Sequence, residues 1–384
     1  MPDGFGVTNL PYGVAVSSRF DGPRVVSRVG DRVVDLAALA EAGVVPREAW
    51  WTQPSLNAFM AAGAEAWRSV RAALTGVAEE LRSGSSATLG TALHEVAAVT
   101  MLRPVEVADY VDFYASEHHA ANLGRILRPG QAPLPPNWRH LPIGYHGRSG
   151  TVVGSGTPVR RPRGQRLVDG EVTVGPTERL DVEVEVGFVV GAPSQLGDPV
   201  PVDGFADHVF GVCLVNDWSA RDMQAWEYQP LGPFLGKSFA TSMSAWVVPL
   251  DALAAARVPV GSADWPVQDY LREREPWGLD LSLELVVNGE VRSRPPYASM
   301  FWSPAQMLAH LTSNGASVRT GDLYASGTVS GPAPDQAGSL IELSDNTAFL
   351  TDGDEVVIRG TAPSADGSTL SLGEVRGTVL PANG

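Results

Sequence analysis

The chain has 384 residues, of which 44% are hydrophobic and 18% are charged, so it is long enough for two domains and apolar enough to build a core. Its 28 basic and 43 acidic side chains give a formal net charge of −15, which argues against nucleic acid or an anionic membrane as the main partner. No apolar run approaches the roughly 18–20 residues of a membrane span. The first residues show no secretory signal, so we expect a cytoplasmic protein. Its one cysteine, Cys213, lies in an apolar run and is expected to be a buried free thiol.

The first hundred residues predict a small domain. Residues 7–37 combine apolar pairs with Gly-Asp turns, a pattern typical of short strands in a small β-barrel. Apolar side chains then recur three and four residues apart, which predicts a helix that faces a core. They are Leu56, Phe59, Met60, Trp67, Val70, Leu74, Val77 and Leu81. The stretch RSGSSATLG at 82–90 is the most linker-like in the chain, and we expect one domain over residues 1–101 and a second over 102–384.

The segment 108–130 gathers polar side chains, which include Asp112, Tyr114, His118, His119 and Arg128. A single histidine is usually structural, but two adjacent histidines in so polar a region favour a catalytic role for one of them. Zinc is a poor fit because the chain has no Cys/His quartet. The available oxygen ligands favour Ca²⁺ or Mg²⁺.

Three carboxylates alternate with valines in LDVEVEVGFVVG. On a strand, Asp181, Glu183 and Glu185 share one face. The alternative interpretation is a solvated acidic face on an edge strand. The strand runs directly into an apolar segment, however, and buried carboxylates need a cation or another partner. We therefore favour Glu183 and Glu185 as site residues.

Asp217 ends the next apolar run and precedes a helix predicted to begin near Ser219. On this helix Arg221, Gln224 and Tyr228 share one face, an arrangement typical of a binding site. A capping role for Asp217 or Ser219, with Arg221 as a surface charge, remains the alternative.

Lys237 is the single lysine among the 28 basic residues; the other 27 are arginine. A compositional bias explains this count, and so does a site that needs a compact ammonium group. A P-loop interpretation fails, because Gly232 lies one residue too close to Gly236 for the spacing G-x-x-x-x-G-K-[ST]. The rest of the chain has many apolar runs of four to eight residues between turn residues, which predicts a mainly β domain, a mixed roll or sandwich.

Together these stretches resemble the fumarylacetoacetases, from residue 9 to beyond 355. The resemblance is carried by NLPYGV, QPSLNAFM, DYVDFY, PNWRHLPIGYHGRSGTVVGSG, LDVEVEVGF, NDWSARDMQAWEYQPLGPFLGKSF and LYASGTVSGP. A wider superfamily of hydrolases, hydratases and decarboxylases shares EVE, NDWSARD and GKSF in looser form. The resemblance implies a small N-terminal SH3-like β-barrel, a larger C-terminal mixed β-roll and a cytoplasmic homodimer. It also implies metal-dependent hydrolysis of a C–C bond in 4-fumarylacetoacetate, the last step of tyrosine and phenylalanine breakdown.

The resemblance further implies roles for individual residues. The implied Ca²⁺ ligands are Asp112, Glu183, Glu185 and Asp217. His119 matches the general base, and Glu342 matches the carboxylate that orients it. The implied oxyanion-stabilising group is Arg221, Gln224 and Lys237. The implied substrate contacts are Tyr114, Arg128, Gln224, Tyr228 and Thr328.

Lys237 and Thr241 match a second, Mg²⁺-type position of the family. The chain has Ala240-Thr241 where the family usually has Gly-Thr, and residues 249–276 are only loosely similar. Two other functions stay open: hydrolysis of another β-diketone or an acylpyruvate, and a non-catalytic Ca²⁺-binding scaffold. The intact set of His119, Glu342 and Lys237 argues against the scaffold.

Overall fold

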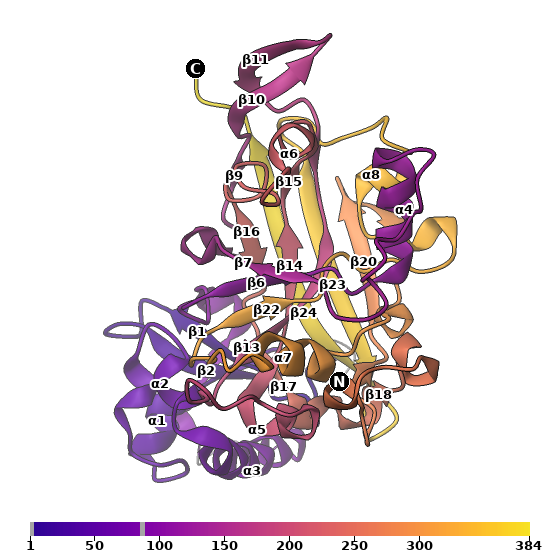
Figure 1. Cartoon of the computed structure of the whole chain (residues 1–384). Coiled ribbons are helices and arrows are strands. Elements are labelled where there is room, and N and C mark those ends of the chain that lie inside the picture. Colours follow the sequence, from indigo (N-terminus) through magenta and orange to yellow (C-terminus); the bar gives the residue numbers. More distant parts are fainter. Residues whose placement is uncertain (1–3, 85–88) are drawn as a thin grey trace.

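The N-terminal part of the protein is built on one small antiparallel sheet. The computed structural model describes residues 4–84 and 89–384 (Figure 1), so part of the predicted linker at 82–90 lies outside the described residues. The strands are β1 (Tyr12–Val16), β2 (Arg24–Val29), β3 (Arg32–Asp35), β4 (Leu93–Glu95) and β5 (Thr100–Met101). They pair in the order β4-β3-β2-β1-β5. A small β-rich N-terminal unit was predicted, and the structure shows it.

The predicted helix over 56–81 is two helices rather than one. Helix α1 (Leu36–Glu41) precedes them, and they are α2 (Asn57–Met60) and α3 (Gly63–Arg82). The interruption falls at Gly63, whose φ of +83° lies in the left-handed region that glycine tolerates. The apolar stripe nevertheless faces the core, with Phe59, Val70 and Leu74 fully buried.

The C-terminal part is a roll of two large mixed sheets. The first has the order β7-β6-β22-β13-β14-β16-β8, and β17 also pairs with β14. Its strands are β6 (Tyr110–Phe113), β7 (Gly144–His146), β8 (Val152–Gly154), β13 (Val184–Val190), β14 (Val209–Asp217), β16 (Thr241–Met243), β17 (Val248–Pro249) and β22 (Leu323–Ala325). The second has the order β21-β20-β23-β24-β9. Its strands are β9 (Val159–Arg160), β20 (Ser282–Val287), β21 (Glu290–Ser293), β23 (Glu355–Pro363) and β24 (Thr369–Leu380).

Short helices and two-stranded ribbons surround these sheets. The helices are α4 (Glu117–Leu127), α5 (Phe205–His208), α6 (Arg221–Glu227), α7 (Pro304–Thr312) and α8 (Leu340–Leu343). The ribbons are β10 (Arg163–Val168) with β11 (Glu171–Pro176), β12 (Leu180–Asp181) with β15 (Ser219–Ala220), and β18 (Arg257–Val258) with β19 (Gly278–Leu279). In Figure 1 the β10–β11 hairpin projects from one end of the roll near α6, and α4 lies beside α8.

Strand β14 is buried on both faces, and this joins the two parts of the protein. Val212 and Leu214 belong to the core inside the roll, whereas Cys213 and Val215 belong to a second core shared with the N-terminal sheet and α3. Residues that alternate along a strand point to opposite faces, so β14 contributes to both cores. Cys213 is a buried free thiol as predicted, and burial raises its pKa to about 12.

Within the described residues, none of the helices combines the length and the hydrophobicity needed to cross a bilayer.

Candidate functional site

Three carboxylates meet on the eight-stranded sheet. Asp112 comes from β6, Glu185 from β13 and Asp217 from the end of β14, and one oxygen of each lies within 4.8 Å of the others. The strand order explains the meeting, because β13 pairs with β14 on one side while β22 joins β13 to β6 on the other. All three side chains are buried. Asp181 and Glu183, the other carboxylates of the predicted strand, are buried as well, so the alternative of a solvated acidic edge strand is wrong.

Glu185 gives a direct test of whether these residues fit a cation. Its side chain is fully buried, and neither carboxylate oxygen has a hydrogen-bond partner in the part of the chain that the structure describes. Burial raises its pKa well above the ordinary value, and the nearby charges of Asp112 and Asp217 raise it further. A buried carboxylate without a partner is costly, and a cation would relieve that cost. The donors are all oxygens, which suits Ca²⁺ or Mg²⁺.

Glu183, the fourth predicted carboxylate, does not join this group directly. The predicted strand is interrupted between β12 and β13, and Glu183 lies in the interruption. Its Oε1 is 2.7 Å from Nη1 of Arg221, and its Oε2 accepts a hydrogen bond from Lys237. Lys237 also donates to Asp217 Oδ2 at 2.7 Å, so its ammonium group links Glu183 to the other three carboxylates. Burial opposes ionisation of Glu183, but Lys237 and Arg221 lower its pKa.

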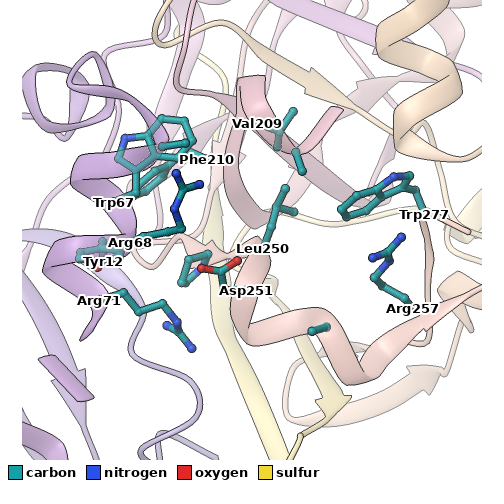
Figure 2. Close-up of a pocket in the computed structure, with 14 residues that line it drawn as sticks. Tyr12, Trp67, Arg68, Arg71, Val209, Phe210, Leu250, Asp251, Arg257 and Trp277 are labelled. Atoms are coloured by element: carbon teal, nitrogen blue, oxygen red, sulfur yellow. The ribbon is translucent and has the colours of Figure 1, made fainter. Parts of the chain in front are cut away.

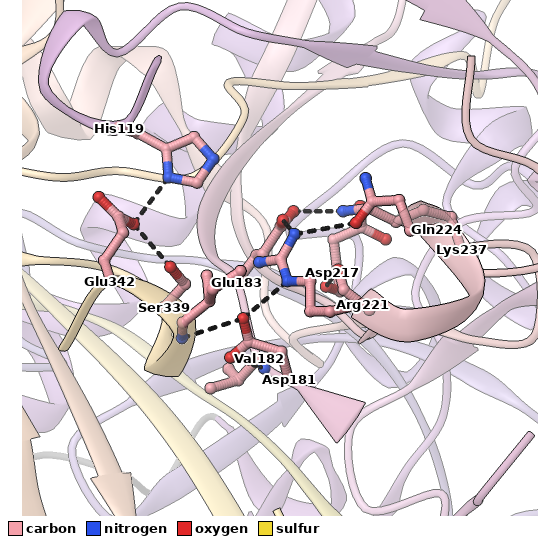
Figure 3. A network of polar contacts seen from close by, with 12 residues as sticks. His119, Asp181, Val182, Glu183, Asp217, Arg221, Gln224, Lys237, Ser339 and Glu342 are labelled. Carbon is pink, nitrogen blue, oxygen red and sulfur yellow. Dashed lines mark hydrogen bonds and ion pairs between the residues drawn. The ribbon is translucent and has the colours of Figure 1, made fainter. Parts of the chain in front are cut away.

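Asp181, the first acidic residue of the predicted strand, holds Arg221 from the other side (Figure 3). Its Oδ2 accepts from Nε of Arg221 at 2.8 Å, and its Oδ1 accepts from the backbone N–H of Leu340 at 2.8 Å. Arg221 is thus fixed between Asp181 and Glu183, and its Nη2 is buried without a hydrogen-bond partner among the described residues. The interpretation of Arg221 as a surface charge is wrong, since only 5% of the residue is exposed.

The charges of this region do not balance. Its buried carboxylates are Asp112, Asp181, Glu183, Glu185 and Asp217. Its buried cations are Arg148, Arg221 and Lys237. Two negative charges remain uncompensated when all of these groups are ionised, which equals the charge of one divalent cation. The count agrees with the unpartnered Glu185.

Arg148 was missed by the sequence analysis. Its Nη2 lies 2.7 Å from Asp112 Oδ2 and 2.7 Å from Asp217 Oδ2, and Tyr145 donates a hydrogen bond to Asp112 at 2.9 Å. Arg148 lies in a turn after β7 and has a φ of 62°, in the left-handed region. Strand and helix periodicity cannot identify a turn residue. The signal that could have found it is the conspicuous GYHGRSG stretch.

The backbone around Lys237 is fixed against α6. A Cβ atom on Gly236 would lie 2.8 Å from the backbone nitrogen of Gln224, so glycine permits this close approach. Glu227 Oε1 accepts from the N–H groups of Phe234, at 2.9 Å, and of Gly236, at 2.7 Å. Burial alone would lower the pKa of Lys237, but Asp217 and Glu183 raise it above the ordinary value. Lys237 is therefore a rigidly held ammonium group.

His119 and Glu342 form a buried pair, as Figure 3 shows. His119 Nδ1 is 2.7 Å from Glu342 Oε2, within the range expected for an orienting hydrogen bond. Glu342 also accepts from Asn122 at 2.8 Å and from Ser339 at 2.6 Å. Burial would raise the pKa of Glu342, but His119 and these hydrogen bonds lower it to about 2. The second ring nitrogen of His119 faces away from Glu342, whereas His118 is only half-buried.

The other predicted contacts divide into two groups. The Tyr114 ring meets the His119 ring edge-on at 5.5 Å, Gln224 Oε1 accepts from Arg221 at 3.1 Å, and the Thr328 hydroxyl is buried without a partner. Arg128 donates to the Pro133 carbonyl and its charge also acts on the pKa of Tyr114, while the Tyr228 hydroxyl accepts from Gln229. Thr241 donates to Asp217 Oδ1 at 2.9 Å and so positions a carboxylate.

Comparison with known proteins covers nearly the whole chain. Residues 8–104 match the family model described as fumarylacetoacetase N-terminal, and residues 109–380 match that described as fumarylacetoacetate (FAA) hydrolase C-terminal. The fumarylacetoacetase of Homo sapiens is 42% identical over 409 residues, covering 98% of this chain and 96% of its own. That of Arabidopsis thaliana is 41% identical over 404 residues, covering 98% of this chain and 96% of its own.

Solved structures support the same fold. A fumarylacetoacetate hydrolase from Exiguobacterium antarcticum superposes with a TM-score of 0.60 at 18% identity, covering 97% of this chain and all of that one. A maleylpyruvate hydrolase from Sphingobium gives a TM-score of 0.53 at 18% identity, covering 97% of this chain and all of that one. The buried acidic site lies in the segment matched by the C-terminal model. The two family matches and the identity to curated relatives show that the chain belongs to the fumarylacetoacetate hydrolase family.

Proposed function

We propose that the protein hydrolyses 4-fumarylacetoacetate to fumarate and acetoacetate, the final step of tyrosine and phenylalanine breakdown. The observation that carries the proposal is the His119–Glu342 pair, present with the buried Arg221–Lys237 group in a chain 42% identical to a fumarylacetoacetase over 98% of its length. A related β-diketone or an acylpyruvate is the alternative substrate class.

In this proposal His119 is the general base. Glu342 holds Nδ1 of the ring, so the other nitrogen takes a proton from water. The water oxygen bonds to the ketone carbon beside the alkene, and the bond from this carbon to the adjacent methylene then breaks. The electron pair of that bond goes to the enolate of acetoacetate, and the proton held by His119 is returned to its carbon. The atoms balance without a covalent enzyme intermediate.

The oxyanion formed when water adds needs donors that are already in position. Arg221 Nη2 is buried and unpartnered, while its Nε is held by Asp181. Lys237 uses two of its hydrogens on Glu183 and Asp217 and retains a third. Gln224 accepts from Arg221 through its amide oxygen, which leaves its amide nitrogen as a further donor. These donors are fixed before the substrate arrives, which is the condition for strong electrostatic stabilisation.

The residues that would hold a divalent ion are Asp112, Glu185 and Asp217, with Glu183 adjacent through Lys237. When bound, Ca²⁺ or Mg²⁺ supplies an electrophile for the oxygens of a diketone. A second Mg²⁺ at Lys237 and Thr241 stays a prediction; both side chains donate hydrogen bonds to Asp217.

The function is tested by incubating the purified protein with fumarylacetoacetate. We expect loss of the diketone absorbance together with equal amounts of fumarate and acetoacetate. A parallel reaction with acetylpyruvate separates the two substrate classes, because faster turnover of acetylpyruvate would favour the alternative. Absence of both reactions in metal-supplemented, folded protein would contradict the proposal.

Replacing Glu185 by Gln is expected to weaken Ca²⁺ binding strongly. The change removes one of the two negative charges that the buried cations of the site leave uncompensated. Calorimetric titration of chelator-treated protein measures this, with Glu65→Gln as the control on the exposed face of α3. We expect Glu65→Gln to bind Ca²⁺ like the unmodified protein. Equal affinity of the Glu185→Gln protein would place the ion elsewhere.

We also propose a homodimer that covers an exposed apolar surface beside α6. Val174 of the β10–β11 hairpin is 70% exposed, and Leu231 and Phe234, in the loop that leads to Lys237, are 94% and 68% exposed. Trp226 of α6 donates to Gln165 of β10 at 3.3 Å, so the hairpin and the helix form one surface. A second copy of the chain would bury it.

The double substitution of Val174 and Leu231 by Asp is expected to give a monomer by sedimentation velocity. Leu196→Asp is the matched control, because Leu196 is 83% exposed in the segment between β13 and α5. A double variant that remains dimeric would show that the interface lies on another face. We also propose a cytoplasmic location and a domain boundary near residue 101. The boundary is supported by the family models, since the N-terminal match ends at residue 104 and the C-terminal match begins at residue 109.

A further inference from the structure

We propose that a cavity between the N-terminal unit and the roll binds a small aromatic carboxylate. The cavity has a volume of about 130 Å³. Figure 2 shows Trp67, Arg68 and Arg71 of α3 on one side, facing Leu250 and Asp251. β1, α5 and β14 complete the walls, and none of the lining residues belongs to the acidic site or the His119 pair.

The cavity offers positive charge in a strongly acidic protein. Its charged lining residues are Arg68, Arg71, Arg257 and Asp251. Arg257 pairs with Glu275 at 3.0 Å, and Arg71 donates to the carbonyls of Asn9 and Thr8 at 2.9 and 2.7 Å. Within residues 4–84 and 89–384, the exposed Arg68 has no ion pair or hydrogen bond, whereas the nearby charge of Asp251 partly offsets the lowering of the Arg71 pKa by burial. An anion entering the cavity would therefore meet the unpaired guanidinium group of Arg68, with Asp251 as the acidic residue among the lining side chains.

Tyr12 is a second, independent indication of a ligand. The side chain lines the cavity, only 1% of the residue is exposed, and its hydroxyl has no hydrogen-bond partner among residues 4–84 and 89–384. Burial raises the pKa of this phenol, so it remains a protonated donor at neutral pH. An unsatisfied buried hydroxyl carries a free-energy cost. A carboxylate oxygen is an acceptor that would satisfy it and also pair with arginine.

The remaining walls favour a planar apolar body. Trp67 meets Phe210 edge-on at 5.2 Å, and the Tyr12 ring lies 5.4 Å from Phe210. Trp277 closes the far side, with the Arg257 guanidinium 3.8 Å from its ring centroid. Aromatic side chains of this kind pack well against another ring. Inorganic phosphate would leave these walls without an apolar contact, so we assign the cavity to an aromatic carboxylate.

A ligand in this place would touch both parts of the protein. Arg68 and Trp67 belong to α3, whereas Phe210 and Leu250 belong to the roll. A molecule that binds only the folded arrangement stabilises it by mass action. Binding should therefore be visible as a concentration-dependent rise in melting temperature, independent of any hydrolase activity.

Benzoate is the probe for the carboxylate, and benzamide is its neutral match. We expect a saturable calorimetric isotherm and a raised melting temperature with benzoate, and neither with benzamide. Tyr12→Phe and Arg68→Gln should each weaken benzoate binding by about tenfold, the effect of one hydrogen bond to a charged group. Tyr12→Phe should melt no lower than the unmodified protein without benzoate, because the lost hydroxyl has no partner.

Arg82→Gln is the matched control, since Arg82 lies on the same helix and pairs with Glu79 outside the cavity. It should bind benzoate like the unmodified protein, and so should His119→Ala, which distinguishes the cavity from the catalytic site. Unchanged affinity in both Tyr12→Phe and Arg68→Gln, or no saturable benzoate binding, would overturn the proposal. Inorganic phosphate that binds as tightly as benzoate would overturn the assignment to a carboxylate.

Discussion

Replacing Lys237 by Arg is expected to lower kcat by about 100-fold or more, nearly as much as replacement by Ala, although Arg keeps the charge. The Lys237 ammonium group occupies a position between Glu183 and Asp217, and Arg148 and Arg221 already fill the adjacent space against the same carboxylates. The Gly236 backbone is packed against α6 and cannot retreat. A planar guanidinium group therefore has no room to reproduce these contacts. Steady-state turnover of fumarylacetoacetate measures the effect.

Arg359→Lys, at a half-exposed position on β23, is the control for an Arg–Lys exchange and should leave kcat unchanged. Circular dichroism separates a catalytic loss from unfolding, which matters for Lys237→Ala because this change leaves Glu183 and Asp217 without their shared cation. Normal turnover by Lys237→Arg would show that the residue supplies charge alone.

His119→Ala is expected to reduce kcat by about 10²–10⁴-fold, the usual contribution of a general base, while Ca²⁺ binding is retained. Glu342 holds the histidine, and the side chains that would bind the ion are the carboxylates of Asp112, Glu185 and Asp217. His118→Ala should have little effect, because the adjacent ring points in another direction on α4. Glu342→Gln should lower kcat without unfolding the protein. Turnover and calorimetric Ca²⁺ binding of the three variants are the measurements.

The lowered pKa of Glu342 means that this carboxylate is ionised at any pH used for the turnover measurements near neutrality. A folded pKa of about 2 lies below that of an unfolded glutamate, so the carboxylate stabilises the fold above the unfolded value and loses this effect only as pH falls towards 2. Glu342 therefore stays ionised throughout the neutral range.

If the His118→Ala protein lost its turnover while the His119→Ala protein remained active, the assignment of the general base would be reversed.

The sequence could predict residues whose chemistry and periodicity coincide. Asp217 follows a run of apolar residues, and Glu185 alternates with valines that are buried, so both carboxylates could be placed in a site. Periodicity was misleading where the backbone departs from a regular strand. Asp181 and Glu183 were expected on one continuous face with Glu185, but the interruption between β12 and β13 turns them towards Arg221.

The roles of turn residues and the ion pairs between distant segments could not be predicted from sequence patterns. Arg148 reaches Asp112 and Asp217 from a left-handed turn, which no spacing rule reveals. The His119–Glu342 contact joins residues far apart in the chain, and the family resemblance, not the local pattern, suggested it. Gly63 likewise divides a helix that the apolar spacing predicted as continuous.

The order of strands in the larger sheet has a consequence for how the protein is made. β22 lies between β6 and β13, so the strand that places Asp112 beside Glu185 is synthesised long after both of them. Contacts between distant segments carry a loop-closure cost and form late. A nascent chain that ends before Leu323 can already pair β13 with β14, which brings Glu185 close to Asp217, but it lacks the strand that holds Asp112 beside them. The acidic centre is thus completed only when β22 has been made and most of the roll is available to surround it.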